Sequence, residues 1–202
     1  MRERRVLLTG FEPFGSSRAN PSQAVVEQLR EQHIPGVELH AHVLPVEFTA
    51  AVDRVIELLK SVQPDVVIAL GQAEGRDRIT PERVAVNLAD ARMADNGGHV
   101  PVDEPVVTDG PSAYFSTLPV KAIVEELVAA EVPSGLSMTA GTYVCNTVFY
   151  AVQHHLQGTD VQSGFIHIPL MDPQADEFPG LPTLPLEVLV RATRVAIEVA
   201  TR

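Results

Sequence analysis

The chain has 202 residues, of which 45% are hydrophobic, and it carries a formal net charge of −11 at pH 7. This length suits one globular domain with a buried core, and the acidic surplus repels phosphate backbones, so we expect no nucleic-acid binding. No apolar run is long enough to span a bilayer, and no signal-peptide pattern follows the basic N-terminus. We therefore expect a cytoplasmic protein that does not associate with membranes.

Short aliphatic runs alternate with amphipathic segments of helical length through the first third of the chain. This alternation is typical of βαβ units, in which parallel strands are covered by helices. Strands are expected at 6–9, 37–43 and 66–70, and helices at 21–32 and 48–61.

The middle of the chain departs from this alternation. Between residues 71 and 118 one strand is expected, at 84–87, and the remainder is rich in Asp, Asn, Gly and Pro. A loop of this length in a compact domain usually serves function or forms an interface.

The alternation of strands and helices resumes after residue 118. Helices are expected at 119–131, 144–157 and 186–201, and strands at 136–139 and 164–168. The whole pattern predicts the α/β class. We expect a single domain over residues 1–202, a three-layer sandwich with a mostly parallel twisted sheet and helices on both faces.

Cys145 is the only cysteine of the chain, which rules out an internal disulfide and a cysteine-based zinc site. It follows the turn at 139–142 and opens the helix expected at 144–157. Unpaired amides and the helix dipole at this position stabilise a thiolate and could hold an oxyanion. A lone cysteine is also often a small buried hydrophobic residue, and composition alone leaves that choice open.

His167 is the strongest candidate for a base that serves Cys145. It lies between Ile166 and Ile168 near the end of the strand expected at 164–168, so its side chain points to the opposite face from theirs. Sites in parallel sheets gather at the carboxyl ends of strands, beside helix N-termini. A core histidine bonded to the backbone is an equally good interpretation of this position.

Glu82 stands just ahead of the strand expected at 84–87. A carboxylate there could hold His167 in one tautomer and stabilise its imidazolium. The chain has 26 acidic residues, most of them simply solvated, and spacing alone does not single out Glu82.

The loop after the first expected strand resembles a phosphate-binding loop in the spacing of Gly10 and Gly15. The lysine that should follow the second glycine is missing. Glu12 repels a phosphate and Pro13 removes an amide donor. We therefore do not expect this loop to bind phosphate.

Phe11 and Phe14 in the same loop suit a flat, uncharged group better. Asn20, and Gln72 at the end of the third expected strand, could supply amide contacts to such a group. Ordinary core packing of the two aromatic rings is the alternative interpretation.

Five motifs occur together in the chain, in a fixed order. They are TGFEPFG at 9–15 with NPS at 20–22, ERVAVN at 82–87, DGPSAYFSTLP at 109–119, AGTYVCN at 140–146 and GFIHIP at 164–169. This set resembles the family of type I pyroglutamyl peptidases, also called pyrrolidone carboxyl peptidases. The resemblance spans nearly the whole chain.

The resemblance implies a cysteine omega-peptidase that removes an N-terminal pyroglutamyl residue from peptides through a thioester, without metal or cofactor. Cys145 matches the nucleophile of the family, His167 the general base and acid, and Glu82 the carboxylate that orients the histidine. The resemblance also implies a homotetramer, and the middle segment 71–118 is a candidate interface.

The resemblance also assigns a substrate pocket. Phe11 and Phe14 match the aromatic loop over the pyrrolidone ring, Gln72 a residue that hydrogen-bonds the ring, and Arg92 a suggested oxyanion contact. Departures from the family pattern occur at Glu74, at Met93 with Ala94, and at Thr147.

Two other functions fit part of the pattern. A nucleoside phosphorylase-like glycosyl transferase shares the α/β style of sheet, and phosphate dependence would reveal it. An acidic ligand-binding module would hold Cys145 for structure only, and alkylation of the thiol would leave its function intact. Neither accounts for all five motifs.

Overall fold

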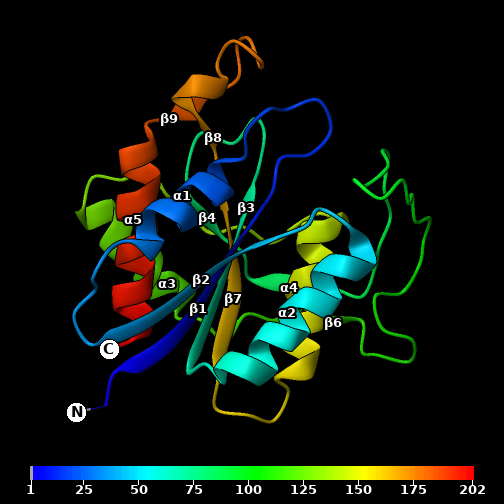
Figure 1. Cartoon of the computed structure of the whole chain (residues 1–202), viewed down its shortest axis with the longest axis horizontal. Coiled ribbons are helices and arrows are strands. Elements are labelled where there is room, and N and C mark those ends of the chain that lie inside the picture. The colour runs from blue at the N-terminus through cyan, green and yellow to red at the C-terminus, as the bar shows by residue number, and fades with distance from the viewer. Residues whose placement is uncertain (1) are drawn as a thin grey trace.

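A computed structural model describes residues 2–202, and one five-stranded sheet organises them (Figure 1). The strand order is β2-β1-β3-β7-β4. The pairs β1–β2, β1–β3 and β3–β7 are parallel, whereas the two-residue β4 runs antiparallel to β7. The strand bounds are Arg4–Phe11 for β1, Val37–Leu44 for β2, Val66–Gln72 for β3, Thr80–Pro81 for β4 and Gln162–Ile168 for β7.

Helices cover both faces of this sheet (Figure 1). On one face α5 packs against α1 and α3, and on the other α2 packs against α4. The helix bounds are Pro21–Arg30 for α1, Phe48–Val62 for α2, Val120–Ala129 for α3, Val144–His155 for α4 and Leu186–Ala200 for α5. The predicted fold class, a mostly parallel sheet between two helical layers, is confirmed.

The core is divided by the sheet into two hydrophobic clusters. Alternation along β7 shows the division: Phe165 belongs to the cluster under α2 and α4, while Ile166 and Ile168 belong to the cluster under α1, α3 and α5. Each fully buried side chain of this size stabilises the fold by about 1.5–3 kcal/mol relative to exposure. His167 therefore lies on the same face as Phe165, as the sequence predicted.

The first helix sits unusually close to the first strand. A Cβ atom on Gly10 would lie 2.5 Å from the carbonyl oxygen of Ser22, so only glycine permits this approach. The helix starts at Pro21, and Asn20 caps it by accepting a hydrogen bond from the Ser22 amide at 2.9 Å. The loop between β1 and α1 is thereby held over the carboxyl edge of the sheet.

The segment predicted as a strand at 136–139 is not a strand, and that prediction was wrong. Only isolated bridges occur in this region, of Ser134 to Ile79 just before the predicted range and of Ser137 to Glu82 within it. The apolar residues behind the prediction, Leu136 and Met138, are 41% and 61% exposed. Their alternation therefore does not mark a face buried in the sheet.

Smaller elements complete the fold outside the central sheet. The strand predicted at 84–87 forms as β5, but it pairs with a strand that was not predicted, β6, instead of joining the main sheet. Among residues 2–202 no helix combines the length and apolarity needed to cross a membrane. The remaining bounds are Val84–Val86 for β5, Ala113–Phe115 for β6, Leu170–Met171 for β8, Asp172–Gln174 for the 3₁₀ helix η1 and Thr183–Leu184 for β9.

Candidate active site

A cavity of about 340 Å³ opens at the carboxyl ends of β1, β3 and β7, next to the first turn of α4. This is the position at which parallel sheets commonly hold their ligands. The lining residues are Phe11, Phe14, Asn20, Val46, Gln72, Ala73, Glu74, Arg76, Thr139, Ala140, Gly141, Tyr143, Val144, Cys145 and His167. Six of the eight residues predicted for the site are among them.

Cys145 lies in the first turn of α4, as predicted, with its sulfur directed at β3. A Cβ atom on Gly71 would be 2.9 Å from the Cys145 Sγ, so the thiol occupies the space that this glycine leaves free. Burial, followed by the charge of Glu82, raises the pKa of the Cys145 thiol to about 12. The helix N-terminus was expected to lower that pKa, but enclosure of the sulfur outweighs it.

His167 lies beside the thiol on the neighbouring strand. In the register of β3 and β7 it pairs with Gly71, the residue that the Cys145 sulfur contacts. Its ring packs on Phe165 with the centroids 4.8 Å apart. Burial lowers the pKa of His167 below its ordinary value, and the opposing effect of Glu82 does not restore it. The imidazole is therefore neutral at pH 7.

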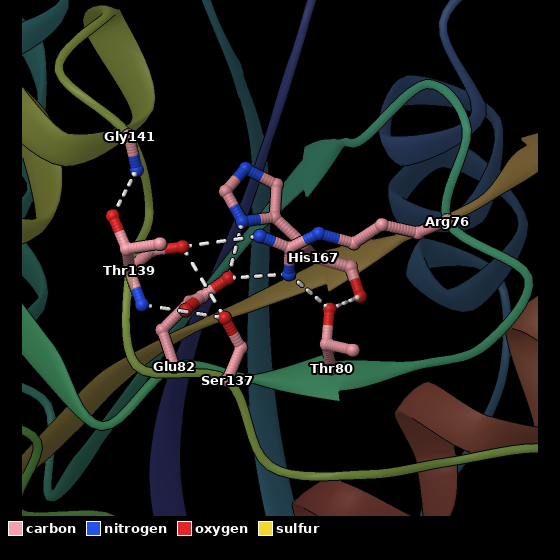
Figure 2. A network of polar contacts seen from close by, with 7 residues as sticks. All are labelled: Arg76, Thr80, Glu82, Ser137, Thr139, Gly141 and His167. Carbon is pink, nitrogen blue, oxygen red and sulfur yellow. Dashed lines mark hydrogen bonds and ion pairs between the residues drawn. The ribbon is translucent and has the colours of Figure 1, made fainter.

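Glu82 is fully buried behind His167 and does not itself line the cavity. Its Oε1 lies 2.8 Å from the His167 Nδ1 and also accepts a hydrogen bond from Arg76 (Figure 2). Burial by itself raises the pKa of Glu82, but the hydrogen bond and charge of His167, with smaller effects of Ser137 and Arg76, leave it below its ordinary value. The group is a carboxylate that fixes the Nδ1–H tautomer of the histidine.

The other end of the cavity is lined by aromatic rings and amides. Phe11 is 3% exposed and packs on Phe165, whereas Phe14 is half-buried and packs on Tyr143. Asn20 lines the cavity too, although its amide donates to the Glu12 carbonyl at 3.0 Å and its oxygen caps α1. The aromatic loop thus contributes both to the core and to the cavity.

The amide of Gln72 is held at both ends. Its Oε1 accepts a hydrogen bond from Gln174 at 3.0 Å, and its Nε2 donates to Glu74 at 3.2 Å. Gln174 is 1% exposed and also donates to the carbonyl of Ala19, next to Asn20. A side chain behind the cavity therefore connects β3 to the loop that carries the aromatic rings.

Arg92 is not brought to this cavity. It is exposed on the loop that follows β5 and is absent from the cavity lining. The arginine that does reach the site is Arg76, which sequence reasoning missed. Gln174 was missed as well, because both act through contacts set by loop conformation and neither belongs to a periodic pattern.

The loop after β1 is not arranged to hold phosphate. Its acidic side chain, Glu12, turns back and accepts hydrogen bonds from the Val46 amide at 3.1 Å and from Asn96 at 2.8 Å. A carboxylate at this place repels a phosphate. Within residues 2–202 no group of three or more His, Cys, Asp or Glu side chains is placed to hold a metal ion.

At the end of the parallel sheet a thiol lies beside an imidazole, and the imidazole is paired with a buried carboxylate. This arrangement is that of an α/β cysteine hydrolase. The family described as Pyroglutamyl peptidase matches residues 4–202. The chain belongs to the pyroglutamyl peptidase family.

Relatives and solved structures agree with this assignment. A pyrrolidone-carboxylate peptidase of Vibrio vulnificus is 52% identical over 187 residues, which are 93% of this chain and 88% of that protein. One of Cupriavidus taiwanensis is 50% identical over 199 residues, 96% of this chain and 92% of that protein. The structure of pyroglutamyl peptidase I from Bacillus amyloliquefaciens has a TM-score of 0.95 at 40% identity, covering 98% of this chain and 95% of that one. A mutant pyrrolidone carboxyl peptidase from Pyrococcus furiosus has a TM-score of 0.94 at 40% identity and covers 97% of each chain.

Proposed function

We propose that this chain hydrolyses the amide bond after an N-terminal pyroglutamyl residue, with Cys145 as nucleophile, His167 as base and acid, and Glu82 as the carboxylate that orients His167. One observation carries the assignment of roles. The Cys145 sulfur rests on Gly71, whose partner in the sheet is His167, and the Nδ1 of that histidine is 2.8 Å from Glu82.

The protonation states of Cys145 and His167 suit transfer of a proton from the neutral thiol to the neutral imidazole. Cys145 starts as a thiol and His167 as a neutral imidazole, so the Nε2 of His167 takes the thiol proton while sulfur attacks the scissile carbonyl carbon. The imidazolium next protonates the departing amine, and the C–N bond breaks to leave a thioester. A water molecule then adds to the thioester carbonyl and gives a proton to His167. The C–S bond breaks to release the pyroglutamate, and the imidazolium returns the proton to the Cys145 sulfur.

The first turn of α4 is suited to hold the oxyanion of each addition step. The N-cap residue, Tyr143, makes no side-chain hydrogen bond to the helix, so no capping side chain occupies the amides of the first turn. Amides at a helix N-terminus that lack an intrahelical acceptor stabilise a developing negative charge. A contact from Arg92 would require its loop to move toward the cavity.

The cavity fits the chemistry of a pyroglutamyl ring. The ring is flat and uncharged, so it needs an apolar slot with a few amide partners and no carboxylate to hold an amino terminus. Phe11 and Phe14 offer that slot, and the amide of Gln72 offers polar contacts. The carboxylate in the lining, Glu74, accepts a hydrogen bond from the Gln72 Nε2. Proline lacks the lactam carbonyl, and leaving a buried donor without a partner can reject such an analogue by a factor on the order of 10⁴.

Release of a fluorescent amine from its pyroglutamyl amide tests the proposal directly. Wild type should turn over this compound and not the matching prolyl amide, and Cys145→Ala should abolish turnover while the protein stays folded by circular dichroism. Thr147→Ala, a change in the same helix outside the cavity lining, should retain activity. Hydrolysis by Cys145→Ala, or an inert but folded wild type, would overturn the proposal.

We propose further that the protein is a cytoplasmic homotetramer. A cysteine that acts as nucleophile must remain reduced, and the cytosol keeps thiols reduced. The middle segment 71–118 presents the apolar side chains of Met93, Val100 and Val102 at its surface, with Val102 67% exposed. Sedimentation of particles of 21.8 kDa alone would contradict the tetramer. Val102→Ser should weaken assembly, whereas Val128→Ser, on a residue 59% exposed on α3, should not.

A further inference from the structure

Arg76 connects its own loop and the adjoining residues Thr80 and Glu82 to a distant segment of the active site, at Thr139. It lies on the loop between β3 and β4 and lines the cavity. Its Nη1 donates to the Glu82 Oε1 at 2.6 Å and to the Thr80 hydroxyl, and its Nη2 donates to the Thr139 carbonyl at 3.0 Å (Figure 2). The Thr139 carbonyl belongs to the cavity wall immediately before α4 and Cys145.

The guanidinium and the imidazole share one carboxylate oxygen. The Glu82 Oε1 accepts from Arg76 and faces the Nδ1 of His167 at 2.8 Å, while the buried Oε2 has no hydrogen bond within residues 2–202. A carboxylate oxygen polarised by a cation is a weaker base. The proton on His167 Nδ1 therefore stays on the ring, which leaves Nε2 free to accept the thiol proton.

The geometry favours arginine over any other cation at this place. Its planar fork directs Nη1 and Nη2 at two acceptors on different loops, Glu82 and Thr139. The Arg76 side chain is 26% exposed, so the ion pair with the fully buried Glu82 is only partly screened by water. A lysine would keep the charge but would not hold both acceptors in this geometry.

We propose that Arg76 is a positioning residue of the reaction, whose guanidinium holds Glu82 and the Thr139 segment in the arrangement that His167 and Cys145 require. The inference rests on the proposed function. It assigns to Arg76 no contact with the substrate, since three of its hydrogen bonds already go to the protein.

The charge of Arg76 also predicts a pH effect that a merely structural side chain would not produce. The charged or titratable groups around His167 are Glu82, Arg76 and Cys145, and Glu74 and Tyr143 line the same cavity. Burial is the largest influence on the pKa of Glu82, of Cys145 and of His167, and the charge of Arg76 adds a lowering to each. Removal of that charge should raise the pKa of His167 and move the acid limb of activity to higher pH.

The test compares Arg76→Met, which removes the charge, with Arg76→Lys, which keeps the charge and loses the fork. Arg76→Met should lower kcat by about 10- to 100-fold with little change in KM, and should shift the acid limb upward. Arg76→Lys should keep the limb in place and recover only part of kcat. Thr80→Val removes one partner of Arg76 without removing charge, and should leave the limb unmoved.

Two outcomes would overturn the inference. One is an acid limb of Arg76→Met that coincides with that of wild type, and the other is an unaltered kcat in Arg76→Lys. The comparison of kcat between Arg76→Lys and wild type can be made even if Arg76→Met does not fold. NMR titration of the His167 imidazole in wild type and Arg76→Met needs no substrate, so its result is independent of the proposed peptidase activity. A pKa of His167 that is not higher in Arg76→Met would refute the electrostatic part of the inference.

Discussion

Gly71 and Cys145 are in contact across the interface of β3 and α4, and the contact exists because residue 71 has no side chain. A Cβ atom there would lie 2.9 Å from the Cys145 sulfur and 2.7 Å from the ring of Phe165. The thiol can therefore sit on the strand directly beside His167, which is the partner of Gly71 in the sheet.

Gly71→Ala should consequently disable the site. The added methyl group must displace the sulfur or the Phe165 ring, and a misplacement of about 1 Å costs on the order of 10²-fold in kcat/KM. Overpacking should also lower the free energy of unfolding by about 1–3 kcal/mol. Activity of the variant on the pyroglutamyl amide, with its chemical denaturation, measures both effects.

Gly164→Ala is the matched control for this prediction. A Cβ atom there would meet the Ser116 hydroxyl and the Leu118 side chain, away from the cavity. It should lose stability through similar overpacking and keep its kcat/KM. Equal loss of activity in the two variants would show that Gly71 matters only for folding.

Glu82→Gln should reduce kcat by about 10²- to 10⁴-fold. The amide keeps the size of the side chain but removes the charge that stabilises the His167 imidazolium, and it can present a donor to Nδ1. KM should change little, because Glu82 does not line the cavity. Steady-state kinetics on the pyroglutamyl amide gives both parameters.

The control for Glu82→Gln is Asp95→Asn. Asp95 is a buried carboxylate that accepts hydrogen bonds from the amides of Phe48 and His99, outside the cavity lining. Its variant should lose stability while kcat remains near that of wild type. A Glu82→Gln enzyme with undiminished kcat would argue against the orienting role.

The plot of kcat/KM against pH should have an acid limb whose midpoint lies below the ordinary histidine pKa of 6.5. His167 must be unprotonated to accept the thiol proton, and its pKa lies below the ordinary 6.5 because of burial. The base form is thus complete at neutral pH and is lost as pH falls through this lowered pKa. No alkaline limb from the thiol is expected near neutrality, since burial raises the pKa of Cys145 to about 12.

Measurement of kcat/KM from about pH 4.5 to about pH 10 would show this profile. The rate of Cys145 alkylation by iodoacetamide provides a second reading of the thiol, and it should still be rising at the alkaline end. A midpoint of the acid limb above 6.5 would contradict the predicted state of His167.

Gln174→Met should raise KM for the pyroglutamyl amide by about 10-fold with a small effect on kcat. The change removes the donor that fixes the Gln72 amide and the bond to the Ala19 carbonyl, so the ring pocket loses its order. Gln153→Met, which removes a buried hydrogen bond to the Ser163 carbonyl elsewhere, should leave KM unchanged. An unaltered KM in Gln174→Met would mean that Gln72 is held without it.

Much of the fold follows from local pattern. The strands β1, β3 and β7 each contain a short aliphatic or aromatic run, and α4 has an apolar stripe at helical spacing, so their types and approximate bounds could be predicted from the sequence. The failures fall where pairing is short and non-local. The wrong strand at 136–139 and the unpredicted β6 lie outside the central sheet, and the unpredicted β4, of two residues, lies at its edge.

The pattern along the chain was enough to predict which residue types are available to the site. It placed Cys145 at the start of a helix and His167 near the end of a strand, because both positions depend on periodicity within about ten residues. The set of five motifs indicated the family. The pairing of Glu82 with His167, 85 residues apart, had no local signal and rested on the family resemblance.

How these groups affect one another follows from the folded arrangement and from no local pattern. The raised pKa of Cys145, the position of Arg76 on the Glu82 carboxylate and the exposure of Arg92 all depend on which loops meet at the end of the sheet. Burial and charge act through space over a few ångströms, whereas a sequence pattern reports neighbours along the chain. For this reason the helix position of Cys145 indicated a thiolate, whereas its enclosure against Gly71 raises the pKa of the thiol and keeps it neutral.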